Sequence, residues 1–142
     1  MSEIKIMRSL LFTAIVTTLF AGTAVYADDH LQAVGLQPVQ VGDVTYVTGG
    51  IGDDERSAIE SEKNNYNLHI MSAMKTGEFV SDTTIVIRNK QGEELLNTTS
   101  GPLFYANIPA GNYTVESTND GQTKSQKIAI RKGGSAHVHF GW

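Results

Sequence analysis

The chain has 142 residues, a formal net charge of −4 and no cysteine. With 11 basic against 15 acidic residues, it lacks the excess of positive charge that favours binding to nucleic acid or anionic membranes. Without disulfide bridges the fold must depend on a hydrophobic core, and a chain of this length is long enough to form one.

The N-terminal segment is predicted to be a secretory signal peptide. Lys5 and Arg8 give it a positive start, and an uncharged apolar run follows over 10–21. This run of about a dozen residues is shorter than the roughly 20 that a membrane-spanning helix needs. Val25-Tyr26-Ala27 then offers a site for signal peptidase. We expect cleavage after Ala27, no membrane span in the mature chain and a periplasmic or secreted location; an uncleaved membrane anchor is the alternative.

Residues 28–65 are predicted to form a leader strand, a glycine-rich turn and a short helix. The strand covers 39–47, where β-branched residues dominate apart from a Gly-Asp interruption. Over 53–64 glycine and proline disappear, and acidic side chains occupy the first turn, where the helix dipole favours them. The sequence therefore predicts one helix of about three turns, which must pack on a sheet to be stable.

The glycine-rich turn Gly49-Gly50-Ile51-Gly52 enters this helix as phosphate-binding loops do. However, Asp53, Asp54 and Glu55 stand where a phosphate would lie and would repel it. The three acidic residues also lack the alternate spacing of a calcium-binding EF-hand loop. We interpret the segment as a strand-to-helix connection with acidic capping.

Residues 66–142 are predicted to form a β-sandwich. Segments with period-two alternation recur between turn signals, among them Pro109-Ala110-Gly111-Asn112 and Asn119-Asp120-Gly121. In the first of these turns Gly111 is expected to take a positive φ. Short strands with a turn signal about every 8–12 residues are typical of sandwiches. The sequence therefore predicts a mostly β fold of about seven strands.

The stretch FYANIPAGNYTVES over 104–117, followed by NDG and a closing HVHF, resembles the transthyretin-like, carboxypeptidase-regulatory-like class of β-sandwich. The segment GGIGDDERSAIESEKNNYNLHI is similar to the front end of small exported bacterial proteins that carry such a domain. The resemblance implies a transthyretin-like, immunoglobulin-like sandwich and an accessory role without catalysis. Together with the patterns above, the sequence predicts a seven-stranded sandwich with one short N-terminal helix, preceded by a signal peptide.

One group in that class is enzymatic, the 5-hydroxyisourate hydrolases, which close with Tyr-Arg-Gly-Ser. Here the chain closes with His-Val-His-Phe-Gly-Trp, so we expect no such activity. No Cys-His or Ser-His-Asp arrangement suggests a nucleophile either. The chain is therefore expected not to be an enzyme and to need no cofactor.

His137 and His139 are the candidate metal ligands. Residues two apart on a strand point to the same face. Val138 and Phe140 are expected to face the core, so both imidazoles would point outward together. Two imidazoles so placed form a partial site for Zn²⁺ or Cu²⁺, unless they are ordinary surface histidines. Three residues are candidates for the missing third ligand: His30, His69 and Met71.

Four aromatic residues near the predicted turns, Phe104, Tyr105, Tyr113 and Trp142, are interpreted as core and cross-strand residues rather than as a binding surface. The function expected is that of a periplasmic or secreted interaction or accessory domain of the bacterial envelope, with a protein partner and no nucleic acid. The alternative is a periplasmic copper- or zinc-binding protein that uses the C-terminal His-x-His strand.

Overall fold

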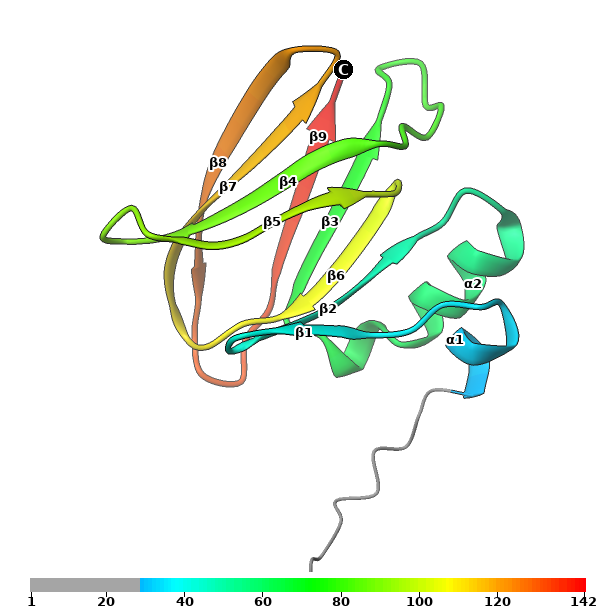
Figure 1. Cartoon of the computed structure of the whole chain (residues 1–142), viewed down its shortest axis with the longest axis horizontal. Helices are drawn as coiled ribbons and strands as arrows, with labels where there is room; N and C mark the ends of the chain where they lie inside the picture. Colours follow the sequence, from blue (N-terminus) through cyan, green and yellow to red (C-terminus); the bar gives the residue numbers. More distant parts are fainter. Residues whose placement is uncertain (1–28) are drawn as a thin grey trace, which may run out of the picture.

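The computed structural model describes residues 29–142, so the predicted signal peptide lies outside the described residues. The described chain forms two β-sheets with helices beside one of them (Figure 1). Sheet A has five strands in the order β1-β2-β6-β3-β9, and sheet B has four in the order β5-β4-β7-β8. In this part of the chain, no helix is long and apolar enough to cross a membrane.

The bounds of the elements are as follows. The strands are β1 (Val39–Val41), β2 (Val44–Gly49), β3 (Leu68–Ala73), β4 (Thr83–Asn89), β5 (Glu94–Ser100), β6 (Leu103–Asn107), β7 (Gly111–Asn119), β8 (Gln122–Ile130) and β9 (Ala136–Gly141). The helices are α1 (Asp29–Ala33), α2 (Asp53–Ser61) and a 3-10 turn, η1 (Lys63–Asn65). Strand β3 pairs with β6 in the antiparallel sense and with β9 in the parallel sense.

The expected mostly β, sandwich-like fold is confirmed, but the described residues form nine strands rather than seven. The leader strand is interrupted at Gly42, whose φ is +56°, and Val41 pairs with Val44 across the resulting turn. The leader therefore becomes the hairpin β1-β2, and β2 pairs along β6 as a full member of sheet A.

The expectation of a single short helix was also incomplete. The predicted helix is present as α2, and η1 follows it after one residue. A second helix, α1, forms where the sequence showed little periodicity. Its Leu31 is fully buried in a cluster with Ile59 of α2, so α1 is held by tertiary packing.

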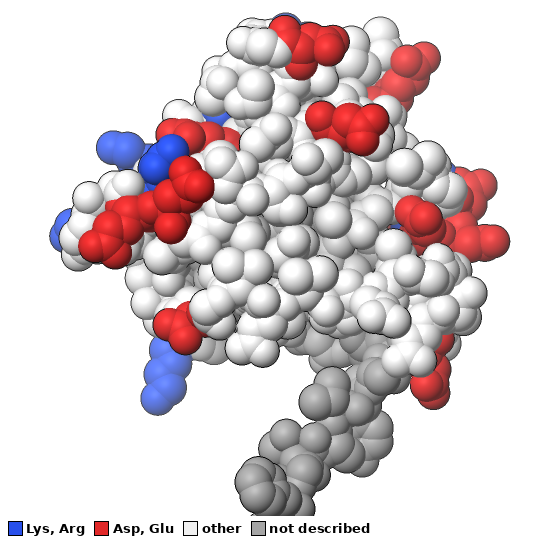
Figure 2. Space-filling view, in the orientation of Figure 1, with Lys and Arg blue, Asp and Glu red and all other residues white. Residues whose placement is uncertain are grey.

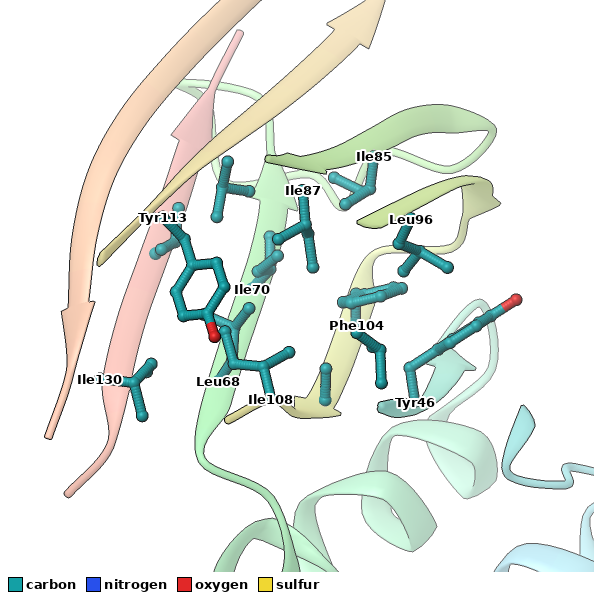
Figure 3. Close-up of a cluster of buried hydrophobic side chains, with 14 of the residues drawn as sticks. Tyr46, Leu68, Ile70, Ile85, Ile87, Leu96, Phe104, Ile108, Tyr113 and Ile130 are labelled. Carbon is teal, nitrogen blue, oxygen red and sulfur yellow. The ribbon is translucent and has the colours of Figure 1, made fainter. Parts of the chain in front are cut away.

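The main core lies between the two sheets (Figure 3). Ile70 of β3 and Phe104 of β6 face Ile85 and Ile87 of β4, and all four are essentially inaccessible to solvent. Tyr46 stacks on Phe104 with ring centroids 5.0 Å apart. Of the four aromatic residues interpreted as core, Phe104, Tyr105 and Tyr113 are buried and Trp142 is partly buried, 6.4 Å from the ring of Phe140. That interpretation is confirmed.

Side chains link the two sheets at both edges of the sandwich. The hydroxyls of Tyr46 and Thr98 lie 3.2 Å apart between β2 and β5. At the opposite edge, Gln126 of β8 donates to the carbonyl of His139 at 2.8 Å, and Lys124 donates to the carbonyl of Gly141. Strand β9 is therefore held by β3 on one side and by side chains of β8 on the other.

The prediction that Gly111 takes a positive φ was wrong. Gly111 opens strand β7 with a φ outside the left-handed region, so its turn needs no glycine for that reason. The hydroxyl of Tyr113 instead donates to the carbonyl of Pro109 at 2.6 Å, which fixes the corner. The Asp120-Gly121 turn does have two positive φ values, +47° and +77°, as this hairpin signal predicts.

On the face drawn in Figure 2, acidic side chains lie at several separate places rather than in one patch. Figure 2 shows Asp and Glu around the rim of one face, while the centre of that face has no charged side chain. Lys and Arg are fewer in this view and lie next to acidic residues at several points. This face therefore offers no extended positive surface for a polyanion.

Candidate metal-binding site

The outer face of sheet A has two halves. Over β2 and β6 it is covered by α1 and α2, which bury a second apolar cluster. The cluster consists of Leu31, Val47, Ala58, Ile59, Tyr66, Leu103 and Tyr105. Over β3 and β9 the same face carries His69, Met71, His137 and His139. We call these the covered half and the open half.

The covered half is positioned by the glycine-rich turn. The carboxylate of Glu55 accepts hydrogen bonds from the amides of Gly50 at 2.9 Å and Ile51 at 3.3 Å. Arg56 donates to the carbonyl of Gly50 at 3.0 Å and pairs with Asp53. A carboxylate of the chain itself thus occupies two amides of the turn, which supports the interpretation as a strand-to-helix connection, although no side chain caps the N-terminus of α2 by a hydrogen bond.

The open half is built from two rungs of the parallel β3-β9 pair. His69 is in register with His137, and Met71 is in register with His139. The alternate residues, among them Ile70, Val138 and Phe140, face the core and are buried. The outward direction predicted for His137 and His139 is confirmed, and both are exposed.

His69 lies at the border between the two halves and is only 7% exposed. Its Nε2 is 2.9 Å from the carbonyl oxygen of Lys63, and a carbonyl can only accept, so Nε2 carries the proton. Its ring meets Tyr105 edge-on, with centroids 4.6 Å apart. Its Nδ1 lies 3.2 Å from Nδ1 of His137. In the neutral ring, this Nδ1 carries no proton, so its lone pair is the acceptor directed at the neighbouring imidazole.

Burial lowers the pKa of His69 below 6.5, and the nearby positive charges of His137 and Lys63 lower it further. The hydrogen bond to the carbonyl of Lys63 acts in the opposite direction but does not outweigh burial. Burial also raises the pKa of Tyr105 above 10.0, with a contribution from Glu60. At neutral pH the site therefore presents a neutral imidazole beside a neutral phenol.

All four open-half side chains line one hollow of about 260 Å³, together with Glu60, Lys63, Tyr105 and Leu103. A second, more polar hollow of about 390 Å³ shares Lys63, His69 and His137 with it. The second hollow extends toward the asparagines of the 64–67 segment and the glycine turn at 133–134. His69 and His137 therefore line both hollows.

Of the three candidates for a third ligand, the structure brings two to the histidine pair. His69 contacts His137, and Met71 is the cross-strand neighbour of His139. His30 belongs to α1, which packs on α2, and it lines neither hollow. Among residues 29–142 no three His, Cys, Asp or Glu side chains form a group that could hold a metal ion. A site with more than two ligands therefore needs Met71 or a rotation of His139.

Sequence reasoning placed His137 and His139 on one face but could not show that His69 adjoins them. The alternation in β3 does put His69 and Met71 on the same face, and this was the available signal. The pairing that joins the two strands connects residues 68 positions apart. Only the folded sheet supplies it.

No protein family model and no curated protein sequence matches the chain. Among solved structures, the Bacillus anthracis TIE protein is a distant neighbour, with a TM-score of 0.41 and 20% sequence identity. The match covers 53% of this chain and 15% of the TIE protein chain, so the likeness is to a small part of a much longer protein.

Proposed function

We propose that this chain is an exported, non-catalytic β-sandwich domain that binds a copper or zinc ion on the open half of sheet A. The proposal places it in the transthyretin-like, carboxypeptidase-regulatory-like class, whose turn motif it resembles. The observation that carries the metal function is the 3.2 Å distance between Nδ1 of His69 and Nδ1 of His137.

This distance fits two ligands of one ion. Zinc binds imidazole nitrogen at about 2.0–2.1 Å, so two nitrogens of a tetrahedral site lie about 3.3–3.4 Å apart. The two imidazoles are thus close to the spacing of ligands before any ion arrives. In addition, His69 donates its other ring N–H to a backbone carbonyl, which is the usual arrangement for a metal-ligating histidine.

The protonation of His69 supports the same function. A metal ligand must be a neutral imidazole, and protons compete with the ion for it. Because burial lowers the pKa of His69, this ligand is available at neutral pH without proton release. Its burial and its contact with Tyr105 also hold the ring in place, so little side-chain entropy is lost on binding.

The test is calorimetric titration of Zn²⁺ and Cu²⁺ into the mature chain and two variants, His69→Gln and His137→Ala. We expect one equivalent to bind to the wild type, and each variant to lose about tenfold or more in affinity, since even outer contacts of a metal site are worth 10–100-fold. If both variants bound Zn²⁺ and Cu²⁺ as tightly as the wild type, the proposed metal function would be contradicted.

His30 supplies the control for this titration. His30 is an exposed histidine outside the open half, so His30→Ala should leave zinc binding unchanged. In the titrations with Cu²⁺, the wild type and both variants are prepared with His30→Ala as a background substitution, to remove a separate copper site at the N-terminus. If cleavage follows Ala27, the mature chain starts Asp-Asp-His, and a terminal amine, backbone amides and an imidazole can bind Cu²⁺ by themselves.

A second candidate function is that of a protein-interaction domain of the cell envelope. It is favoured by exposed apolar side chains on β3 and the segment after it: Met71, Met74 and Phe79 are 37%, 39% and 44% exposed. Ala73 and Phe79 form an isolated antiparallel bridge, which brings this segment back beside the strand. If a partner binds here, Phe79→Ser should abolish its co-purification, whereas Ile51→Ser, another exposed apolar position, should not.

Export is part of the proposal and has its own test. Mass spectrometry of the protein from the producing cell should give Asp28 as the first residue. An intact Met1 in the envelope fraction would contradict a cleaved signal peptide and would leave the chain anchored by its N-terminal segment.

A further inference from the structure

Resting on the proposed metal function, we infer that the open half is a four-donor site for copper(I), formed by His69, His137, His139 and Met71. Two observations lead to the additional ligands. Met71 and His139 form the rung next to the histidine pair, on the same face of the same two strands. All four side chains line the same hollow of about 260 Å³.

The thioether of Met71 decides the choice of metal. Soft sulfur ligands select copper(I), whereas imidazoles accept zinc and copper alike. Met71 is 37% exposed although it follows the buried Ile70 and lies in register with the buried Leu103 of β6. A flexible, polarizable side chain is therefore left accessible beside three imidazoles.

The four donors can converge on one ion without a change in the backbone. Donors two apart on a strand are separated by about 6.6 Å at Cα, and adjacent strands by about 4.8 Å. His137, His139 and Met71 are exposed, so their side chains are free to rotate toward the fixed ring of His69. The buried residues beneath them, Ile70 and Val138, keep the floor of the site in place.

The surroundings of the hollow suit a singly charged soft ion. Its walls include the apolar Leu103 and the ring of Tyr105, while Lys63 and Glu60 provide one charge of each sign. The charged neighbours therefore nearly cancel. A doubly charged ion would gain little from them, and the soft thioether contact would decide the preference for copper(I).

The experiment is an anaerobic competition for copper(I) against bicinchoninate, with zinc titrated in parallel. The test variant is Met71→Leu, and its matched control is Met74→Leu, since Met74 is 39% exposed just beyond the end of β3 and lines neither hollow. We expect Met71→Leu to lower copper(I) affinity by about tenfold or more while zinc affinity stays unchanged. We expect Met74→Leu to behave as the wild type.

His139→Ala and X-ray absorption complete the test. His139→Ala should lower copper(I) affinity, and the copper(I) complex of the wild type should show a sulfur ligand that Met71→Leu lacks. Equal copper(I) affinity in the wild type, Met71→Leu and His139→Ala would overturn the four-donor site. Zinc or Cu²⁺ binding that still depends on His137 would then leave the proposed function standing. If the wild type binds none of these ions, both the four-donor site and the proposed metal function are contradicted.

Discussion

The covered and open halves lie on the same face of sheet A, but their outward-facing residues differ in chemical type. Over β2 and β6 these residues are Val47, Leu103 and Tyr105, whose apolar surfaces gain stability from burial. Over β3 and β9 they are three histidines and a methionine, all of which can bind metal. The helices cover the half that gains stability from burial and leave the other half accessible.

The border between the halves explains how one supports the other. Tyr66, Tyr105 and His69 form a row of rings, with centroid distances of 6.5 Å and 4.6 Å. η1 ends the helical cover at this row, and its Lys63 carbonyl holds Nε2 of His69. The covered half thus orients His69, one of the proposed ligands in the open half, and the comparison predicts different consequences for changes in each half.

The largest effect is expected in the covered half. Ile59 of α2 is fully buried against the sheet, so Ile59→Ala should lower the free energy of unfolding by about 2–5 kcal/mol through lost burial and a cavity. The measurement is denaturation by urea. Ile51, which is 70% exposed, provides the matched control, and Ile51→Ala should change the stability by less than about 0.5 kcal/mol. Equal effects would mean that the helical cover is not packed as described.

An intermediate effect is expected at the border, as a dependence of stability on pH. The pKa of His69 is lowered in the folded chain, so between that pKa and the unfolded value of 6.5 the unfolded chain binds more protons. In the metal-free protein, the contribution of neutral His69 to the free energy of unfolding should therefore be fully present above about pH 6.5. It should be lost as the pH falls below that value. Lys63, His137, Tyr105 and Glu60 are the titratable groups that surround the ring.

His69→Gln isolates this contribution from that of the carboxylates. Glutamine can still donate to the carbonyl of Lys63 but does not titrate. The difference in unfolding free energy between the wild type and this variant should therefore shrink as the pH falls from 7.5 to 5. A constant difference across that range would show that His69 is not held neutral by burial.

The smallest effect is expected from a charge at the edge of the open half. Glu60 lines the hollow, so Glu60→Gln should weaken zinc binding by about two- to threefold at low salt, as is usual for exposed charges. The effect should disappear at high ionic strength. Glu78→Gln, which removes an acidic residue outside the hollow, should leave zinc affinity unchanged. A larger effect of Glu60→Gln would indicate direct ligation by its carboxylate.

Local patterns were sufficient for several features of this protein. The acidic first turn and the loss of β-branched residues located α2, because these are properties of a single helix. The Asp120-Gly121 turn has the left-handed backbone that its sequence predicts. By contrast, Gly111 of the Pro-Ala-Gly-Asn turn was expected to take a positive φ and does not, and a hydrogen bond from the hydroxyl of Tyr113 to the carbonyl of Pro109 fixes the corner.

The period-two alternation of β9 determined by itself that His137 and His139 point outward, because the alternate residues Val138 and Phe140 are buried in the core. The position of His69 was decided by tertiary structure alone. The parallel pairing of β3 with β9 depends on the order of strands in sheet A, to which the hairpin β1-β2 and strand β6 also contribute. A local pattern shows which way a side chain points, but packing of the whole chain determines which side chain it meets.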